Sequence, residues 1–158
     1  MKQSTISWLR AACLGLGLVL LAGVSGGQIS ALGQTTESTT SQEALAAFAK
    51  QEGLHDAGSF VETVLSLRAT GSLPPRYVTK DQARAHGWRG GGLCSVWPGH
   101  VIGGDTFNNF NGALPESEYI EADLDSTCRS RGGTRLVYSS DQGIFVTVDH
   151  YNSFQVAP

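Results

Sequence analysis

The sequence predicts an α+β domain in which N-terminal helices pack on a C-terminal antiparallel β-sheet. Three segments with helix-start signals lie before residue 90, whereas short extended runs separated by turn residues follow residue 100. Helices that come first and strands that follow together are typical of this fold class. The chain has 158 residues, enough for one ordinary domain of about 100 to 150 residues plus extra ends.

The N-terminal segment has the pattern of a signal peptide. Lys2 and Arg10 precede an uninterrupted run of 14 apolar and glycine residues, from residue 11 to residue 24. This run is shorter than the roughly 20 residues that a membrane-spanning helix needs. Small residues follow it, so we predict a signal peptide over residues 1–26, with a second candidate cleavage site near Gly33. The mature protein would then be secreted, to the extracellular space or the periplasm, without a membrane anchor.

Two of the three cysteines, Cys94 and Cys128, would remain after the signal peptide is removed. Cysteines of an exported protein meet an oxidising compartment, where thiols pair. We therefore predict a disulfide between Cys94 and Cys128. The alternative is two buried free thiols, which a cytosolic location would favour.

Three pairs of residues have the spacing of a helix capping box. The pairs are Thr40 and Glu43, Ser59 and Glu62, and Thr79 and Gln82. The first predicts a short helix over residues 44–50 within a flexible leader, residues 27–57. The second opens a stronger helix that ends at Gly71, and the third opens a helix that closes at Gly87. The main domain is expected to span residues 58–158.

Five extended runs follow the helices. They cover residues 101–107, 118–125, 134–139, 144–150 and 153–156, with a hairpin turn at residues 141–143. Glu121 in the second run and Arg135 in the third alternate with apolar residues, which allows the two to share one face of the sheet. The alternation does not place His150, which requires a bend at the end of the fourth run.

Six short motifs occur in order between about Gly58 and Pro158. They are LPPRYVTK at residues 73–80, AHGW at 85–88, IGGDTF at 102–107, EAD at 121–123, YSSD at 138–141 and DHY at 149–151. These motifs, together with the spacing of Glu121, Arg131, Arg135 and His150, resemble the barnase-like bacterial guanyl-preferring ribonucleases. The resemblance implies their fold, with helices packed on an antiparallel sheet, and cleavage of RNA.

The resemblance implies a metal-independent endoribonuclease that cleaves single-stranded RNA by transesterification. Glu121 would act as general base on the ribose 2'-hydroxyl, and His150 would act as general acid on the departing 5'-oxygen. Arg131, Arg135 and Lys80 would neutralise charge on the phosphoryl group between them. The first product would be a 2',3'-cyclic phosphate.

Residue type alone favours plainer interpretations. Glu121 would be a solvated strand carboxylate, His150 a structural or exposed histidine, and Lys80 an ordinary exposed lysine. The functional alternative for Lys80 is a phosphate site, formed by its ammonium together with the free N–H groups of a helix start. Asp123 is expected to hold Arg131 or Arg135 in place. The histidines and cysteines show no spacing typical of zinc sites, so we expect no metal and no cofactor.

The loop after residue 106 departs from the family pattern. By resemblance it binds the base, together with Tyr151, through Phe107, Asn108, Asn109, Phe110 and Asn111. The family pattern has Glu at position 111 and Arg at position 110. Guanine presents two adjacent donors, which a carboxylate accepts together, whereas the Asn111 amide presents one acceptor and one donor. We therefore expect a relaxed guanine preference, with backbone N–H groups of residues 109 and 110 reaching guanine O6. Phe107 and Tyr151 are either stacking surfaces or core residues.

The overall charge does not attract a polyanion. The chain has 11 basic residues, and removal of Lys2 and Arg10 leaves 9 against 14 acidic residues, a net charge of −5. RNA binding must therefore depend on a local cluster, with Lys80, Arg131 and Arg135 as its members.

Two alternatives to a secreted ribonuclease share the same fold. One is a catalytically weak member that binds RNA or a protein, which the altered base loop and the acidic charge would suit. The other is an antibacterial toxin held by a barstar-like protein inhibitor, a partner that the resemblance allows. We expect the protein to be a monomer.

Overall fold

The computed structural model describes residues 29–158, with side chains from residue 38 onward. The helices of this part are α1 (Ile29–Gln51), α2 (Ala57–Thr70) and α3 (Lys80–Ala85), and the strands are β1 (Tyr77–Val78), β2 (Val101–Phe107), β3 (Tyr119–Asp123), β4 (Arg135–Ser139), β5 (Gly143–Thr147) and β6 (Gln155–Val156). The strands lie side by side in chain order in one sheet. The predicted α+β fold class is confirmed. The predicted signal peptide lies outside the described residues.

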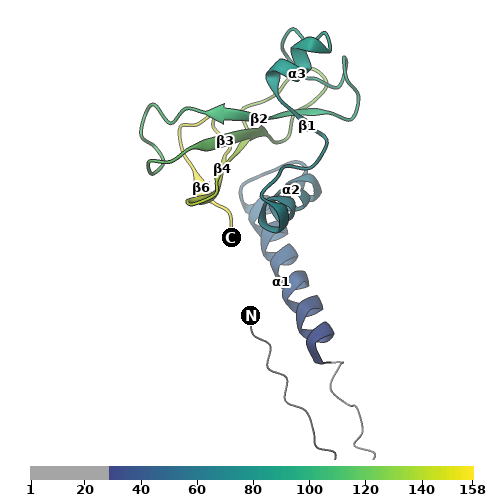
Figure 1. Ribbon diagram of the computed structural model, residues 1–158, viewed down its shortest axis with the longest axis vertical. Coiled ribbons are helices and arrows are strands. Elements are labelled where there is room, and N and C mark those ends of the chain that lie inside the picture. The colour runs from purple at the N-terminus through teal and green to yellow at the C-terminus, as the bar shows by residue number, and fades with distance from the viewer. Residues whose placement is uncertain (1–28) are drawn as a thin grey trace, which may run out of the picture.

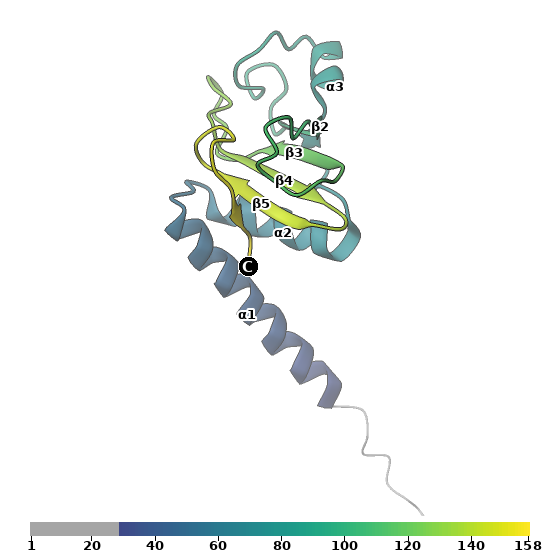
Figure 2. The same cartoon turned by 90° about the vertical axis from the view of Figure 1, so that its left-hand side faces the viewer.

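The first two helices cover one face of the sheet, and α3 lies beside β2 at the far side (Figures 1 and 2). Apolar side chains of α1 and α2 form the main core with the sheet. Its buried members are Leu45, Ala49, Leu54, Phe60, Val64, Leu67, Leu124, Leu136, Val146 and Ala157. A separate apolar cluster of Leu114, Tyr119, Val137 and Phe145 contains strand residues that alternate with those of the main core. The sheet face away from α1 and α2 is therefore free to carry a site.

The register of β3 and β4 decides which side chains face that side. Asp123 pairs with Arg135, and Glu121 pairs with Val137. Directly opposite residues in an antiparallel pair lie on the same face, as do alternate residues of one strand. Glu121, Asp123 and Arg135 therefore share a face, as the alternation in the sequence predicted.

Helix α1 differs from the prediction. It begins at Ile29 and runs continuously to Gln51, whereas the sequence predicted a flexible stretch followed by a short helix over residues 44–50. That prediction is wrong because the first half of the helix is polar and offers no apolar periodicity to detect. Leu45, Ala49 and Leu54, which the sequence analysis assigned to the leader, belong to the main core.

Helix α2 is capped by a residue that the sequence analysis did not select. Asp56 is the N-cap, and its Oδ1 accepts a hydrogen bond from the Ser59 N–H at 2.8 Å. Ser59 therefore lies inside the helix, and Glu62 pairs instead with Arg76 at 2.5 Å. The predicted end at Gly71 is confirmed, because this residue has a φ of 69° and closes the helix in a left-handed conformation.

Helix α3 has the predicted capping box. The Thr79 side chain accepts from the Gln82 N–H at 3.2 Å, and the Gln82 side chain accepts from the Thr79 N–H at 2.8 Å. The helix ends with His86 as its C-cap, next to the predicted stop at Gly87. Among the described residues, no helix combines the length and the apolar character that crossing a membrane would require.

Two features of the sheet were not predicted. Strand β1 pairs with β2 in parallel, so the sheet is antiparallel only from β2 onward. A strand of two residues has no periodicity to detect.

Strand β5 ends at Thr147, three residues before the predicted end, and His150 and Tyr151 follow it with φ values of 58° and 71°. The bend that His150 required is therefore a turn in the left-handed region.

The cap of α2 can be tested by substitution. Asp56→Ala should lower the free energy of unfolding by about 1 kcal/mol, because one N–H of the first helical turn then has no side-chain acceptor. Asp56→Asn keeps an acceptor oxygen and should retain most of the stability. Urea denaturation would measure both, and equal stability of the wild-type protein and Asp56→Ala would contradict the assignment.

Candidate active site

The carboxylate of Glu121 is the centre of the site. Its side chain is only 9 % exposed, although it is charged. The Lys80 ammonium lies 2.5 Å from Oε1, and the Tyr151 hydroxyl donates to Oε2 at 2.5 Å. Three elements far apart in the sequence, α3, β3 and the turn after β5, therefore meet at one carboxylate.

The surroundings of Glu121 keep it ionised. Burial raises the pKa of the carboxyl, but hydrogen bonds from Lys80 and Tyr151 and the positive charges of Lys80 and Arg131 lower it further than burial raises it. The net pKa lies below the ordinary value of 4.5. Burial, followed by the hydrogen bond to Glu121, raises the pKa of Tyr151 to about 12, so its hydroxyl stays protonated and donates.

Two arginines share one buried carboxylate. Arg131 donates to both Asp123 oxygens through Nε and Nη2, each at 2.7 Å, and the Arg135 Nε lies 3.0 Å from Asp123 Oδ1. The pKa of Arg131 is raised, chiefly by its hydrogen bonds to Asp123. The Arg135 guanidinium also donates to the carbonyl oxygens of Thr134, at 2.7 Å, and Gly132, at 3.1 Å. Both guanidiniums are charged and held in fixed orientations beside Glu121.

Lys80 occupies the first position of α3, but the expected free N–H groups are not there. The Lys80 N–H points at both Asp105 oxygens, at 3.2 and 3.0 Å, and the Gln82 N–H is taken by Thr79. The N–H groups of Lys80 and Gln82 are therefore not available to a phosphate, because a carboxylate of β2 and the Thr79 hydroxyl already accept from them. The ammonium group of Lys80 is what reaches the site, through Glu121.

His150 lies at the edge of the site, in the turn after β5. It is exposed, its N–H donates to the Gly133 carbonyl oxygen at 3.2 Å, and its ring centroid lies 4.9 Å from that of Tyr151. Asp149 orders this turn by accepting hydrogen bonds from the N–H groups of Asn152 and Ser153, at 3.1 and 2.9 Å. Hydrogen bonds from Ser153, and then Thr147, lower the pKa of Asp149 to about 2. Tyr151 thus connects His150 to Glu121.

Phe107 belongs to the aromatic packing beside the site. Its ring stacks on that of Tyr151 with centroids 5.1 Å apart, and it meets Tyr119 and Phe154 edge-on at 6.4 and 5.9 Å. Phe107 and Tyr151 both pack against the apolar cluster of Leu114, Tyr119, Val137 and Phe145, but both remain partly exposed. Packing is therefore one role of both rings, and each keeps some surface for a ligand.

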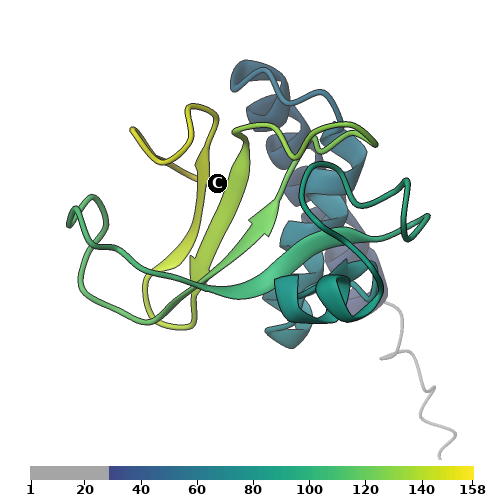
Figure 3. The same cartoon turned by 90° about the horizontal axis from the view of Figure 1, so that it is seen from above.

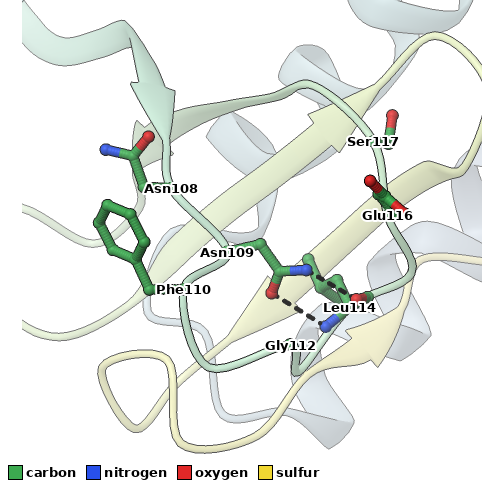
Figure 4. A pocket seen from close by; sticks show the side chains of 7 residues that line it. All are labelled: Asn108, Asn109, Phe110, Gly112, Leu114, Glu116 and Ser117. Carbon is green, nitrogen blue, oxygen red and sulfur yellow. Dashed lines mark hydrogen bonds between the residues drawn. The ribbon is translucent and has the colours of Figure 1, made fainter.

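A pocket of about 510 Å³ lies in the loop after β2. It is lined by Asn108, Asn109, Phe110, Gly112, Leu114, Glu116 and Ser117. Figure 4 shows Asn108 and Phe110 on one side and Glu116 and Ser117 on the other, with Asn109 and Leu114 between them. Asn108, Asn109 and Phe110 were predicted from the sequence. Gly112, Leu114, Glu116 and Ser117 were not, because the loop folds back on itself.

The polar groups of this loop are partly occupied. The Asn109 side chain donates to the Leu114 carbonyl oxygen at 2.7 Å and accepts from the Leu114 N–H at 3.1 Å (Figure 4). Asn111 does not line the pocket, and its Oδ1 accepts from the Ala113 N–H at 3.3 Å. The Phe110 N–H donates to the Asn108 carbonyl oxygen at 2.9 Å, so it is not free for guanine O6 as expected. The Phe110 ring is 93 % exposed.

The structure thus gathers the predicted catalytic residues in one region of the sheet, where Lys80 contacts Glu121 and the two arginines share Asp123. An ionised base, three cations and an imidazole at the edge can bind a phosphodiester and move protons on both sides of it. Asp105 and Asp149, which order this arrangement, were not singled out from the sequence, although both lie inside the quoted motifs. Within residues 29–158 there is no group of three or more His, Cys, Asp or Glu side chains that could hold a metal ion.

Comparisons with known proteins agree with this arrangement. A sequence model of the ribonuclease family matches residues 33–157. A ribonuclease of Heyndrickxia coagulans is 47 % identical in an alignment of 87 positions, which covers 52 % of this chain and 80 % of that protein. Ribonucleases of Bacillus intermedius and Bacillus pumilus show the same identity over 87 residues, and there the match spans only about half, 54 %, of each relative. The chain therefore belongs to the ribonuclease family and is a barnase-like bacterial endoribonuclease.

Proposed function

We propose that this endoribonuclease cleaves single-stranded RNA by transesterification, without a metal ion, and leaves a 2',3'-cyclic phosphate. The observation that carries the proposal is the environment of Glu121. Its carboxylate is buried, is kept ionised by Lys80 and Tyr151, and lies beside two fixed arginines. Each oxygen of the carboxylate accepts one hydrogen bond in the structure and has lone pairs to accept another.

In the first step, Glu121 accepts the proton of the ribose 2'-hydroxyl as the 2'-oxygen attacks the adjacent phosphorus. A bond forms between the 2'-oxygen and phosphorus, and the bond between phosphorus and the 5'-oxygen breaks. His150 gives a proton to the departing 5'-oxygen. The products are a cyclic phosphate and a free 5'-hydroxyl, and DNA is inert because it has no 2'-hydroxyl.

The cations stabilise the charge that develops on the phosphoryl oxygens. Arg131 and Arg135 are already oriented by Asp123, so they need little rearrangement when the charge forms. Lys80 contacts Glu121 in the structure, and a bound phosphoryl group would share its ammonium. A second, slower step hydrolyses the cyclic phosphate with the roles of Glu121 and His150 exchanged.

Export and the monomeric state are further parts of the proposal. The disulfide between Cys94 and Cys128 supports an oxidising location, which agrees with the signal-peptide pattern of residues 1–26. A barstar-like inhibitor stays a prediction from the resemblance alone.

The base loop supports a relaxed preference for guanine. Neither Asn109 nor Asn111 presents a free amide group to the pocket, and neither carries the carboxylate that would accept two adjacent donors. The carboxylate that lines the pocket is Glu116, on its other side (Figure 4).

Substitution of the proton-transfer residues tests the mechanism. Glu121→Gln and His150→Ala should each lower kcat on a fluorogenic RNA by about 100-fold or more, because each removes one proton transfer. The circular dichroism spectrum of each variant should stay that of the wild-type protein. Cleavage by the wild-type protein should persist in EDTA, and chromatography of the products should show a cyclic phosphate. A linear 3'-phosphate formed without that intermediate would refute the scheme. Cleavage of the matched 2'-deoxy substrate would refute it as well.

The pH dependence tests the state of Glu121. Its pKa is lowered, so the carboxylate form that acts as base persists as the pH falls, and the acid limb of kcat/KM should lie below pH 4.5. Tyr151→Phe removes a hydrogen bond that lowers this pKa, so its acid limb should move to higher pH. Initial rates on a dinucleotide would be measured where both proteins remain folded. An unmoved acid limb in Tyr151→Phe would show that the hydroxyl does not tune the base.

Dinucleotide substrates test the base preference. Asn111→Glu should increase the ratio of kcat/KM for GpN over ApN by about 10-fold or more, when a bound guanine draws this side chain away from the Ala113 N–H and toward the pocket. The physical reason is that hydrogen bonds to a charged acceptor are strong. Glu116→Gln serves as the matched control, since it removes only the negative charge of the Glu116 carboxylate, on the other side of the pocket. A wild-type ratio that falls in Glu116→Gln would show that Glu116 already reads the base and that the preference is not relaxed.

A further inference from the structure

A disulfide joins two loops that are far apart in the sequence. Cys94 belongs to the loop between α3 and β2, residues 86–100, and Cys128 belongs to the loop between β3 and β4, residues 124–134. The two loops lie next to each other in Figure 3. Arg131 follows Cys128 closely in the second loop, so the bridge is attached near one of the site's cations.

The α3–β2 loop is firmly anchored. Trp88 and Leu93 are 6 % and 3 % exposed and pack with Val78, Ala83 and Ile102 in a separate apolar cluster. The Trp88 indole N–H also donates to the Gly91 carbonyl oxygen at 3.0 Å. Cys94 directly follows the buried Leu93, so it projects from an ordered base.

The middle of the β3–β4 loop, residues 126–130, has few anchors of its own. Between residues 125 and 134 no side chain is buried, and Thr127, Cys128, Arg129 and Ser130 are exposed. At the start of the loop, the Asp125 carboxylate accepts from the N–H groups of His55 and Asp56 at 3.0 and 2.9 Å, and at its end the Gly133 carbonyl oxygen accepts from the His150 N–H at 3.2 Å. Between these ends, the Thr127 N–H donates to the Ser130 carbonyl oxygen at 2.7 Å and closes a turn. This turn is attached to the domain by the bridge and by the close approach of Gly92, where an added Cβ would lie 2.6 Å from the Cys128 carbonyl carbon.

Arg131 lies where this loop meets the site. Its guanidinium is bound by Asp123 of β3, and its Cζ lies 5.9 Å from the ring centroid of Trp88, in the loop that carries Cys94. Asp123 holds the charged end of the side chain, and the Arg131 carbonyl oxygen accepts from the Arg135 guanidinium at 3.2 Å. The backbone that leads into Arg131, residues 126–130, is held through the bridge.

We propose that the Cys94–Cys128 disulfide positions Arg131 for the phosphoryl group, so that both cysteines are positioning residues for catalysis. This inference rests on the proposed function, in which Arg131 contacts the phosphate. Without the bridge, the loop and the Arg131 backbone gain freedom while the pairing with Asp123 remains. Displacement of a charge stabiliser by a fraction of an ångström lowers turnover without removing the group.

The test is a set of matched variants. Cys94→Ser/Cys128→Ser is compared with the oxidised wild-type protein, each alone and combined with Arg131→Ala or with Lys80→Ala. Arg131→Ala leaves Asp123 paired with Arg135, and Lys80 lies on α3, outside the bridged loops. kcat and KM on one dinucleotide are measured at a temperature where circular dichroism shows every variant folded.

We expect loss of the bridge to lower kcat about 10-fold with little change in KM, and to do so equally in the Lys80→Ala background. In the Arg131→Ala background the same loss should be less than about 2-fold, because no arginine remains to be positioned. A bridge that only stabilises the fold would lower the melting temperature in all backgrounds without this selective effect on kcat.

An equal loss of kcat with and without Arg131 would overturn the inference and leave the proposed function intact. Failure of the oxidised wild-type protein to cleave RNA would contradict the proposed function, and the inference with it. If the double serine variant does not fold, the wild-type protein and Arg131→Ala are compared with the bridge intact and after reduction by dithiothreitol. A loss of kcat on reduction that is much larger in the wild-type protein than in Arg131→Ala would support the inference, and an equal loss in both would overturn it.

Discussion

The site depends on the buried ionic cluster of Asp123 with Arg131 and Arg135. The side chains of Asp123 and Arg135 are 1 % and 3 % exposed, so neither charge can be stabilised by water. Buried charges are tolerated only when they are paired and their remaining hydrogen-bonding groups are satisfied. The carbonyl oxygens of Arg131, Thr134 and Gly132 accept hydrogen bonds from the two Nη atoms of Arg135. Its Nε makes no hydrogen bond within the described part of the chain, although it lies 3.0 Å from Asp123 Oδ1 in the ion pair. The same cluster joins β3 to β4 at the register that places Glu121 beside the cations.

The charge distribution reconciles an acidic protein with a polyanionic substrate. The whole chain carries a formal charge of −3, yet Lys80, Arg131 and Arg135 converge on one face of the sheet around Glu121. A local cluster of this kind attracts a phosphate at short range, where the distant negative charges are screened. The helices α1 and α2 cover the opposite face, so the apolar core and the charged site occupy different sides of the same strands.

Local patterns predicted those elements whose signals lie within a few residues of each other. The capping box of Thr79 and Gln82 marked the start of α3, and Gly71 marked the end of α2, because caps and left-handed ends are local. The same spacing at Ser59 and Glu62 misled, since Asp56 takes the cap and Glu62 pairs with Arg76. The polar start of α1 and the two residues of β1 could not be predicted, because neither segment shows a periodic pattern of apolar residues.

For the site, the sequence by itself determined which side chains could face one another on neighbouring strands. The period of two in a strand places Glu121 and Asp123 on one face, whatever the rest of the fold does. Only the tertiary structure decided that Lys80 touches Glu121 while Asp105 takes its N–H, that His150 lies in a left-handed turn, and that Glu116 lines the base pocket. These contacts join residues far apart in the chain, and their geometry follows from packing that no local spacing records.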